Sequence, residues 1–285
     1  MKSVVLAAVA ALAVTGAVQA APKGPKKPPA EVAPSAADWR ALDPDNTLVI
    51  DTTKGRIVVE LTPAAAPQHV ERIKKLAREG FYDGQSWHRV IDYFMAQTGD
   101  PLGTGEGQSP YPDVPAEFTF RRGPELAMTP VARPAGAVLG FVGTLPIATQ
   151  PDALMARTGD KKVHAWGLYC PGVAGMARGD EPDTANSQFF IMRQPYPALD
   201  KRYTIWGRAV TGLDVVRALN VGEPPENPDK MVRVRMMGDM AAADAPKLKV
   251  MDTSSKAFAA LVDKVRKEKG ADFSICDIEV PVQGG

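Results

Sequence analysis

The middle of the chain carries runs of apolar and β-branched residues whose length and alternation predict strands. Residues 47–53 (TLVIDTT) and 56–61 (RIVVEL) flank Lys54-Gly55, which predicts two strands joined by a glycine-containing turn. Shorter apolar runs predict further strands at 85–91, 94–98, 187–193, 203–210 and 231–237. Strands are therefore expected to build most of the central part of the chain.

Apolar residues follow a helical spacing in three places. Between Pro63 and Gly80 they recur at three- and four-residue intervals, which predicts an amphipathic helix that starts near the proline and stops at the glycine. Residues 212–220 predict a short second helix, and residues 255–269 predict a third that ends at Gly270. One more short strand is expected after it. Many strands without regular strand–helix alternation favour a closed or nearly closed antiparallel sheet.

The first residues have the pattern of a secretory signal. Met1-Lys2 gives a positive start, residues 4–14 (VVLAAVAALAV) are apolar, and Val18-Gln19-Ala20 has the small-x-small pattern of a cleavage site. The apolar run is shorter than the about 20 residues that a membrane span needs. We expect residues 1–20 to be removed, the chain to be exported to a bacterial periplasm, and no membrane insertion afterwards. Residues 21–38, rich in Pro, Ala and Lys, predict a flexible leader.

Composition and charge exclude several classes of protein. The 285 residues are 45% hydrophobic and 24% charged, which suffices to bury a core and excludes disorder for most of the chain. Lys and Arg number 34 against 33 Asp and Glu, a formal charge of +1. Nucleic acids and anionic membrane surfaces attract a clustered positive field. A nearly neutral chain is therefore not expected to have either as its main partner.

Signatures of several common enzyme classes are missing. None of the three histidines is spaced with a second His or Cys as metal ligands are, so no metal site is expected. The sequence has no Gly-x-Ser-x-Gly elbow and no phosphate-binding loop with Lys-Ser/Thr. Residues 103–107 are rich in glycine, but residues 109–112 (SPYP) follow where a phosphate site needs a helix. A nucleotide-binding role is therefore disfavoured.

Arg89 has two interpretations. If residues 87–91 form one strand, alternation places Arg89 on the same face as Trp87 and Ile91. Arg89 could then lie along an apolar wall with its charged end in water, which composition alone favours. Alternatively, its guanidinium is held beside apolar side chains, and Gln97 supplies a neutral hydrogen bond.

Further motifs decide between these interpretations. Residues 87–100 (WHRVIDYFMAQTGD) are followed in order by residues 175–178 (GMAR), 187–191 (SQFFI) and 199–208 (LDKRYTIWGR). Together they resemble the cyclophilin family of peptidyl-prolyl isomerases. The resemblance runs from about residue 48 to residue 240 with one insertion, and four ordered motifs make it specific.

The resemblance implies a mainly β fold, a closed antiparallel eight-stranded barrel capped by two helices. The domain would span residues 39–245, with an insertion at about 121–170 and a C-terminal helical extension at 246–285. It implies a non-covalent, cofactor-free isomerase of Xaa-Pro bonds, whose partners would be proline-containing polypeptides of exported proteins that it helps to fold. The alternative is a cyclophilin-like scaffold or holdase that captures proline segments with little turnover. The oligomeric state is not indicated.

The resemblance also assigns residues. Arg89 would be the catalytic guanidinium, and Gln97 would hold both Arg89 and the substrate carbonyl. The pocket wall and substrate-binding positions would be His88, Phe94, Met95, Ala177, Arg178, Phe190, Leu199 and Tyr203. Three positions depart from the family pattern. Tyr203 stands where a pocket His is common, and Arg178 replaces a common Asn. Ala198 stands where the family often has the Trp that its inhibitor cyclosporin uses, so weak inhibition is expected.

The insertion and the tail each contain one cysteine. The insertion carries roughly 35 residues more than the family pattern needs, and its aromatic residues indicate packing rather than disorder. A stabilising role is favoured over a substrate-shaping lid or partner surface. Because an exported chain meets an oxidising compartment, we hypothesise a disulfide between Cys170 and Cys276 that pins the insertion to the tail.

Overall fold

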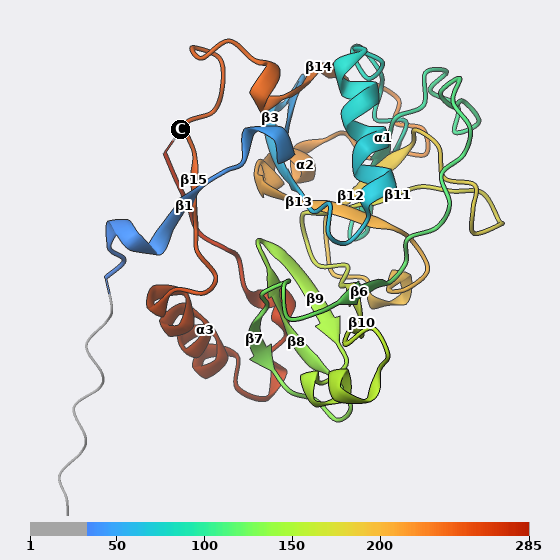
Figure 1. Cartoon of the computed structure of the whole chain (residues 1–285). Coiled ribbons are helices and arrows are strands. Elements are labelled where there is room, and N and C mark those ends of the chain that lie inside the picture. The colour runs from blue at the N-terminus through green and yellow to red at the C-terminus, as the bar shows by residue number, and fades with distance from the viewer. Residues whose placement is uncertain (1–32, 285) are drawn as a thin grey trace, which may run out of the picture. The chain divides into compact units, whose positions relative to one another are not determined.

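The structure is a computed structural model that describes residues 33–284 (Figure 1). The predicted signal at residues 1–20 and most of the predicted leader lie outside the described residues. The last leader positions, Ala36–Asp38, form a short 3-10 turn (η1), so regular structure is present within the predicted leader. In the described part of the chain, no helix has both the length and the apolar character needed to cross a membrane.

An eight-stranded antiparallel sheet forms the larger part of the fold, in the order β14-β2-β3-β13-β11-β12-β5-β4. Its strands are β2 (Thr47–Thr52), β3 (Gly55–Leu61), β4 (Arg89–Val90), β5 (Met95–Thr98), β11 (Val173–Met176), β12 (Phe189–Met192), β13 (Ile205–Thr211) and β14 (Met231–Met236). The predicted strand pair at residues 47–61 is present, and Gly55 makes its turn with φ 135°. The fold is mainly β, as the sequence predicts.

The expected closure of this sheet is not found as a continuous ladder. Within residues 33–284 the edge strands β14 and β4 do not pair with each other. The segments before them meet instead: Ser86 and Lys230 form an isolated bridge, and the Trp87 N–H donates to the Asp229 carbonyl at 2.8 Å. The predicted strand at 85–91 keeps only Arg89 and Val90, which leaves too little extended backbone to form a closing ladder. The sheet is therefore curled but open.

Two helices accompany the sheet. Helix α1 (Pro67–Arg78) begins four residues later than expected, because residues 62–66 form turns in which the Ala65 N–H donates to the Thr62 carbonyl. Proline suits this first helical position because its fixed φ is already helical and its missing N–H would have no partner there. The buried face of α1 joins the inner core, and helix α2 (Leu213–Ala218) adds Val216 to it. The inner core also contains Leu48, Ile50, Trp87, Phe189 and Trp206.

Residues 120–167, which include most of the predicted insertion, form a sheet of their own, in the order β6-β10-β9-β8-β7. Its strands are β6 (Phe120–Arg122), β7 (Thr129–Ala132), β8 (Val138–Val142), β9 (Leu145–Thr149) and β10 (Val163–Gly167). Figure 1 shows this sheet in green beside helix α3 (Lys256–Lys269) of the C-terminal extension, in dark red. The Phe141 and Phe258 rings meet edge to face with centroids 5.5 Å apart. The aromatic residues of the insertion therefore pack, as the sequence indicates.

The start and the end of the described chain join in a third sheet. Strands β1 (Trp39–Ala41), β15 (Lys249–Met251) and β16 (Val282–Gln283) are antiparallel in the order β1-β15-β16. From β1, Arg40 makes a bidentate pair with Glu60 of β3 at 2.6 and 2.8 Å. The structure also joins Cys170 to Cys276, the pair that the sequence predicts, with an S–S distance of 1.97 Å. The tail is thus joined to β1, which contacts β3 through Arg40, and to the segment before β11 through the disulfide.

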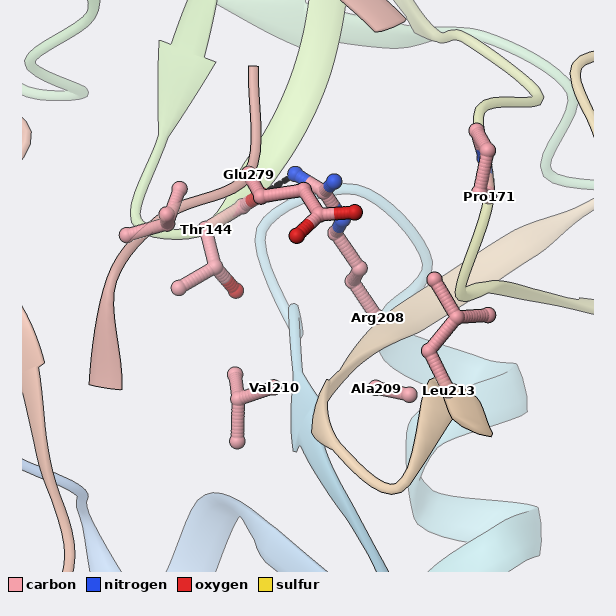
Figure 2. Close-up of a pocket in the computed structure, with 8 residues that line it drawn as sticks. Thr144, Pro171, Arg208, Ala209, Val210, Leu213 and Glu279 are labelled. Carbon is pink, nitrogen blue, oxygen red and sulfur yellow. Dashed lines mark hydrogen bonds between the residues drawn. The ribbon is translucent and has the colours of Figure 1, made fainter. Parts of the chain in front are cut away.

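A buried arginine connects strand β13 to two segments that are distant in the sequence. Arg208 of β13 is 6% exposed, and its guanidinium donates to the Thr144 carbonyl at 3.1 Å and the Ile278 carbonyl at 3.3 Å. Burial lowers the pKa of Arg208 to about 10, and Glu279 partly opposes this. Figure 2 shows the Glu279 side chain alongside Arg208 at a cavity of about 90 Å³. Arg208 therefore links the eight-stranded sheet, the turn between β8 and β9, and the tail.

Candidate active site

The two predicted catalytic residues face each other across a pair of strands. Arg89 of β4 lies opposite Gln97 of β5, and Gln97 lies opposite Phe190 of β12. Directly opposite residues in antiparallel strands point to the same side of the sheet. Arg89 Nη1 accordingly donates to Gln97 Oε1 at 3.3 Å. The sheet thus places the guanidinium, the amide and an aromatic ring in one row on its outer face.

This row corrects the face predicted for Arg89. Ile91 packs against the outer apolar cluster, as alternation predicts. Trp87 does not: it is fully buried in the inner core together with Val90, three residues away. The prediction was wrong at Trp87 because the strand is only two residues long, so alternation does not extend back to that position. The relevant neighbours of Arg89 come from β5 and β12 rather than from its own strand.

Gln97 belongs to a chain of side-chain amides. Its Nε2 donates to Gln188 Oε1 at 2.9 Å, and Gln188 Nε2 donates to the carbonyls of Gly105 at 2.7 Å and Gly107 at 2.9 Å. Because each amide is held at both ends, Gln97 is oriented with its oxygen toward Arg89. Gln188 was not predicted as a site residue, although it lies in the 187–191 motif.

An apolar cluster lies on the same outer face as this row. It contains all six of the predicted pocket residues that are apolar or aromatic, namely Phe94, Met95, Ala177, Phe190, Leu199 and Tyr203. Met95 and Phe190 are 1% and 5% exposed and form its floor, whereas the other four are only partly buried. The Phe190 ring stacks on Tyr169 at 5.6 Å and meets Tyr203 edge to face at 6.0 Å. These contacts fix the ring that would hold a proline.

Gly175 makes this aromatic stack possible. It lies opposite Phe190 in the β11–β12 pair. A Cβ at Gly175 would lie 2.3 Å from the Tyr169 hydroxyl and 2.9 Å from Tyr169 Cε1, and Cβ atoms in proteins do not come that close. Only glycine therefore fits there.

Arg178 covers one side of the pocket. Its guanidinium carbon lies 4.5 Å from the centre of the Tyr203 ring and 5.7 Å from that of Phe118. The side chain is held in this position by Nε, which donates to the Arg202 carbonyl at 3.1 Å. A guanidinium over an aromatic face is attracted by the ring quadrupole. The Arg and Tyr that depart from the family pattern are thus in contact with each other.

His88, one of the predicted substrate-binding positions, is almost fully enclosed. It is only 6% exposed. Burial lowers the pKa of His88, with Asp100 opposing the shift, so the imidazole is neutral at neutral pH. The imidazole is enclosed because His88 lies directly before the two-residue strand β4. The backbone there also directs the neighbouring Trp87 into the inner core.

A polar cavity of about 390 Å³ adjoins Gln97, and Ala177 and Arg178 form part of its lining. The rest of the lining comes from loops that the sequence analysis did not assign to a site: Gly105, Glu106, Gly107, Gln108, Asp113, Gly179, Thr184, Asn186 and Gln188. Burial would raise the pKa of Asp100, but the N–H groups of Leu102 and Gly105 donate to it and lower the pKa overall. The glycine-rich stretch is therefore a loop wound around a buried carboxylate.

An aromatic residue that was not predicted contacts one of the predicted pocket residues. The Tyr196 ring is 4.6 Å from the Phe94 ring, centroid to centroid. Ala198, two residues later, is exposed. An aromatic residue just before the Leu199-Asp200 pair was the available signal.

Among the described residues, no group of three or more His, Cys, Asp and Glu side chains could hold a metal ion.

Asp200, next to Leu199 in the pocket wall, predicts a pH dependence of stability. Burial raises its pKa to about 6, although the Tyr169 N–H, which donates to it at 3.0 Å, acts in the opposite direction. The folded state therefore binds the proton more tightly than the unfolded chain, where the pKa is near 4. This contribution to stability is complete below about pH 4 and is lost as the pH rises through about 6.

We therefore expect Asp200→Asn to raise the free energy of unfolding at about pH 7.5 more than at about pH 4.5. Asparagine keeps the acceptor for Tyr169 without a buried charge. Urea unfolding at both pH values measures the difference, and the exposed substitution Asp180→Asn is the control. An equal effect of Asp200→Asn at the two pH values would contradict the assignment.

Comparison with known proteins identifies the family. The family described as "Cyclophilin type peptidyl-prolyl cis-trans isomerase/CLD" matches residues 47–238, about two thirds of the chain. The chain therefore belongs to the cyclophilin-type peptidyl-prolyl cis-trans isomerases and is an enzyme of that class. The activity of the class is the isomerisation of the peptide bond before proline.

Individual relatives agree with this. A Brucella suis protein named "Probable peptidyl-prolyl cis-trans isomerase" is 34% identical over 215 residues, covering 70% of this chain and 86% of that protein. The Schizosaccharomyces pombe isomerase ppi1 is 32% identical over 190 residues, covering 65% and 94%. The crystal structure of cyclophilin AquaCyp293 from Hirschia baltica is 39% identical with a TM-score of 0.79, covering 86% of this chain and 92% of that one. That last similarity extends beyond the residues of the family match.

Proposed function

We propose that this isomerase acts on Xaa-Pro bonds of exported proteins and assists their folding, with Arg89 and Gln97 as its catalytic residues. The observation that carries the assignment is the contact between Arg89 Nη1 and Gln97 Oε1 at 3.3 Å, in a row with Phe190 on the outer face of the sheet. A charged donor, a neutral amide and a fixed aromatic ring are the groups that this reaction needs.

The reaction is limited by rotation about an amide bond. Delocalisation of the nitrogen lone pair makes the barrier about 18–20 kcal/mol. The cis and trans isomers of the bond before proline differ in free energy by only about 0.5–1 kcal/mol. The enzyme therefore has to lower the barrier to rotation and does not need to shift the equilibrium. As the bond twists, the prolyl nitrogen becomes pyramidal and its lone pair becomes a hydrogen-bond acceptor. A donor at that nitrogen stabilises the twisted state and hardly affects the planar one.

Arg89 supplies that donor. Its side chain is 39% exposed, so its remaining N–H groups can reach a bound peptide. Gln97, oriented by Gln188, holds the guanidinium on one side and offers its own N–H and oxygen to the substrate backbone. No covalent intermediate is needed, because every step is a rotation.

The apolar cluster holds the proline ring while the other half of the bond turns. Met95 and Phe190 form a buried floor, and Phe94, Leu199 and Tyr203 are partly exposed around it. Excluding water from the twisting bond strengthens the hydrogen bond from Arg89, because the local dielectric constant falls. Binding and catalysis are thus divided between the apolar wall and the polar row.

Export is supported by two separate observations. Residues 1–20 have the pattern of a cleaved signal. The Cys170–Cys276 disulfide is of the kind that persists in oxidising compartments such as the periplasm. Expression of the full chain in a Gram-negative bacterium, followed by fractionation and N-terminal sequencing, tests this. We expect a periplasmic protein that begins at Ala21, and a cytoplasmic protein that retains Met1 would contradict the proposal.

The second candidate is a scaffold or holdase that captures proline segments with little turnover. The position of Arg178 over the Tyr203 ring supports this alternative, because it adds a cation that can bind a peptide without taking part in the rotation. A protease-coupled assay on a short Xaa-Pro peptide separates the two. Turnover by the wild type that saturates with peptide supports catalysis. Tight peptide binding without acceleration of exchange would instead establish the scaffold.

The exposed Ala198 predicts weak inhibition by cyclosporin. Its methyl group has no polar donor and little area, whereas the Trp common in the family offers both a ring and an N–H. We expect Ala198→Trp to lower the inhibition constant for cyclosporin at least about tenfold without a change in turnover. Inhibition of the wild type at nanomolar concentration, measured in the same assay, would contradict this expectation.

A further inference from the structure

Arg89 has an acidic partner that the sequence analysis did not single out. Glu223 lies in the loop between α2 and β14, 134 residues from Arg89 in the sequence, and its Oε2 accepts a hydrogen bond from Arg89 Nε at 2.6 Å. This contact is shorter than the 3.3 Å contact between Arg89 and Gln97. Both charged groups are partly open to water, with side chains 39% and 52% exposed.

The loop is fixed to the strand that carries Arg89. Gly222 and Val90 exchange two backbone hydrogen bonds: the Val90 N–H donates to the Gly222 carbonyl at 2.8 Å, and the Gly222 N–H donates to the Val90 carbonyl at 2.9 Å. The residue before Glu223 is thereby fastened beside the residue after Arg89. The carboxylate therefore reaches Arg89 from a backbone that is anchored at this point.

Glycine is required for this anchor. Gly222 has φ 157°, and a Cβ there would lie 2.3 Å from the Cα of Pro225, which is itself buried. The loop thus approaches β4 in a geometry that other residues could not adopt without displacing backbone atoms. An exposed ion pair between two freely moving side chains contributes little. Here the backbone next to Glu223 is fixed by the hydrogen bonds between Gly222 and Val90.

The geometry of the guanidinium explains what this contact does. The group is planar, and its five N–H donors lie in a rigid fork. Glu223 occupies Nε and Gln97 accepts from Nη1, so two contacts define the plane of the group. The remaining N–H donors on Nη1 and Nη2 then keep a fixed orientation instead of moving with the long side chain in solvent. A donor must be in place before the bond twists if it is to stabilise the twisted state.

We propose that Glu223 is a positioning residue for Arg89: by holding Nε it orients the guanidinium toward Gln97 and the twisting prolyl bond. The inference rests on the catalytic role of Arg89 proposed above. Because the effect is on the orientation of a donor used in the twisted state, it changes kcat and leaves peptide binding nearly unchanged.

The test compares kcat and KM for one Xaa-Pro peptide among folded variants. We expect Glu223→Ala to lower kcat about three- to tenfold, with KM changed by less than about twofold. Glu223→Gln keeps the shape and an oxygen acceptor, so it should retain more activity than the alanine variant. Glu226→Ala is the matched control, because Glu226 is exposed in the same loop and has no hydrogen bond or ion pair to any residue of the described part. It should leave both constants unchanged.

Combining the substitutions shows whether Glu223 acts through Arg89. In an Arg89→Ala background, Glu223→Ala should change the residual rate by less than about 1.5-fold. The proposal is overturned if Glu223→Ala matches Glu226→Ala, if KM changes and kcat does not, or if Glu223→Ala lowers the rate equally with and without Arg89. Full activity of Arg89→Ala alone would instead refute the catalytic assignment, so the two failures are distinguishable. Circular dichroism and the melting temperature confirm that each variant is folded.

Discussion

Replacing Arg89 with Ala is expected to lower kcat/KM for an Xaa-Pro peptide about 10²- to 10³-fold, as does loss of one donor that stabilises a transition state. The folded state should survive, because the side chain is 39% exposed and takes no part in either apolar core. Arg89→Lys should recover little activity. A lysine ammonium has no planar fork with which to contact Gln97, Glu223 and the substrate together.

The matched control for this experiment is Arg78→Ala. Arg78 is also a half-exposed arginine in an ion pair, with Asp239 at 2.9 Å, but it lies on helix α1 away from the row of Arg89 and Gln97. It should keep the turnover of the wild type. A folded Arg89→Ala protein with normal turnover would refute the proposed role, whereas equal losses in both variants would indicate a general effect of removing surface charge.

Removing the disulfide by Cys170→Ala and Cys276→Ala together is expected to lower the free energy of unfolding by about 3–5 kcal/mol. The bond closes a loop in which the cysteines are 106 residues apart, so it strongly restricts the unfolded chain. Cys170 is also fully buried in the cluster that contains Phe190 and Met95. Urea unfolding of the oxidised protein and the double variant gives the difference.

The reduced wild type is the control for this substitution. It keeps both sulfur atoms in place and lacks only the covalent link, so its stability should agree with that of the double variant within about 1 kcal/mol. A loss of less than about 1 kcal/mol in the double variant would contradict a stabilising role. A variant that remains folded at low temperature should keep its turnover, because the polar row of Arg89, Gln97 and Gln188 does not include the bond.

Local patterns predicted the elements whose structure is determined by nearby residues. The strand pair β2–β3 and the buried face of α1 follow from alternation, helical spacing and a glycine turn. Strand β4 could not be predicted in this way. Its two residues are too few to define an alternation, and Trp87 turns inward where its own N–H donates to the Asp229 carbonyl. That pairing joins segments that lie far apart in the sequence.

The same limit applies to the site. The resemblance placed Arg89, Gln97 and the pocket wall in one region, and the register of β4, β5 and β12 explains why they meet. Tyr196 and Glu223 were not predicted because each contacts its partner, Phe94 and Arg89, only through the tertiary fold. Neither residue belongs to a motif, and an exposed glutamate before two prolines gives no signal of its partner. Only the fold brings Glu223 to Arg89.

The most direct test of the account measures peptide binding and exchange together. Cis–trans exchange of one Xaa-Pro peptide at equilibrium, followed by NMR, gives the rate, and a titration on the same samples gives the dissociation constant. For Arg89→Ala we predict a dissociation constant within about threefold of the wild type and an exchange rate at least about a hundredfold lower. Exchange at the wild-type rate, or a loss of rate fully explained by weaker binding, would contradict the claim that Arg89 stabilises the twisted bond selectively.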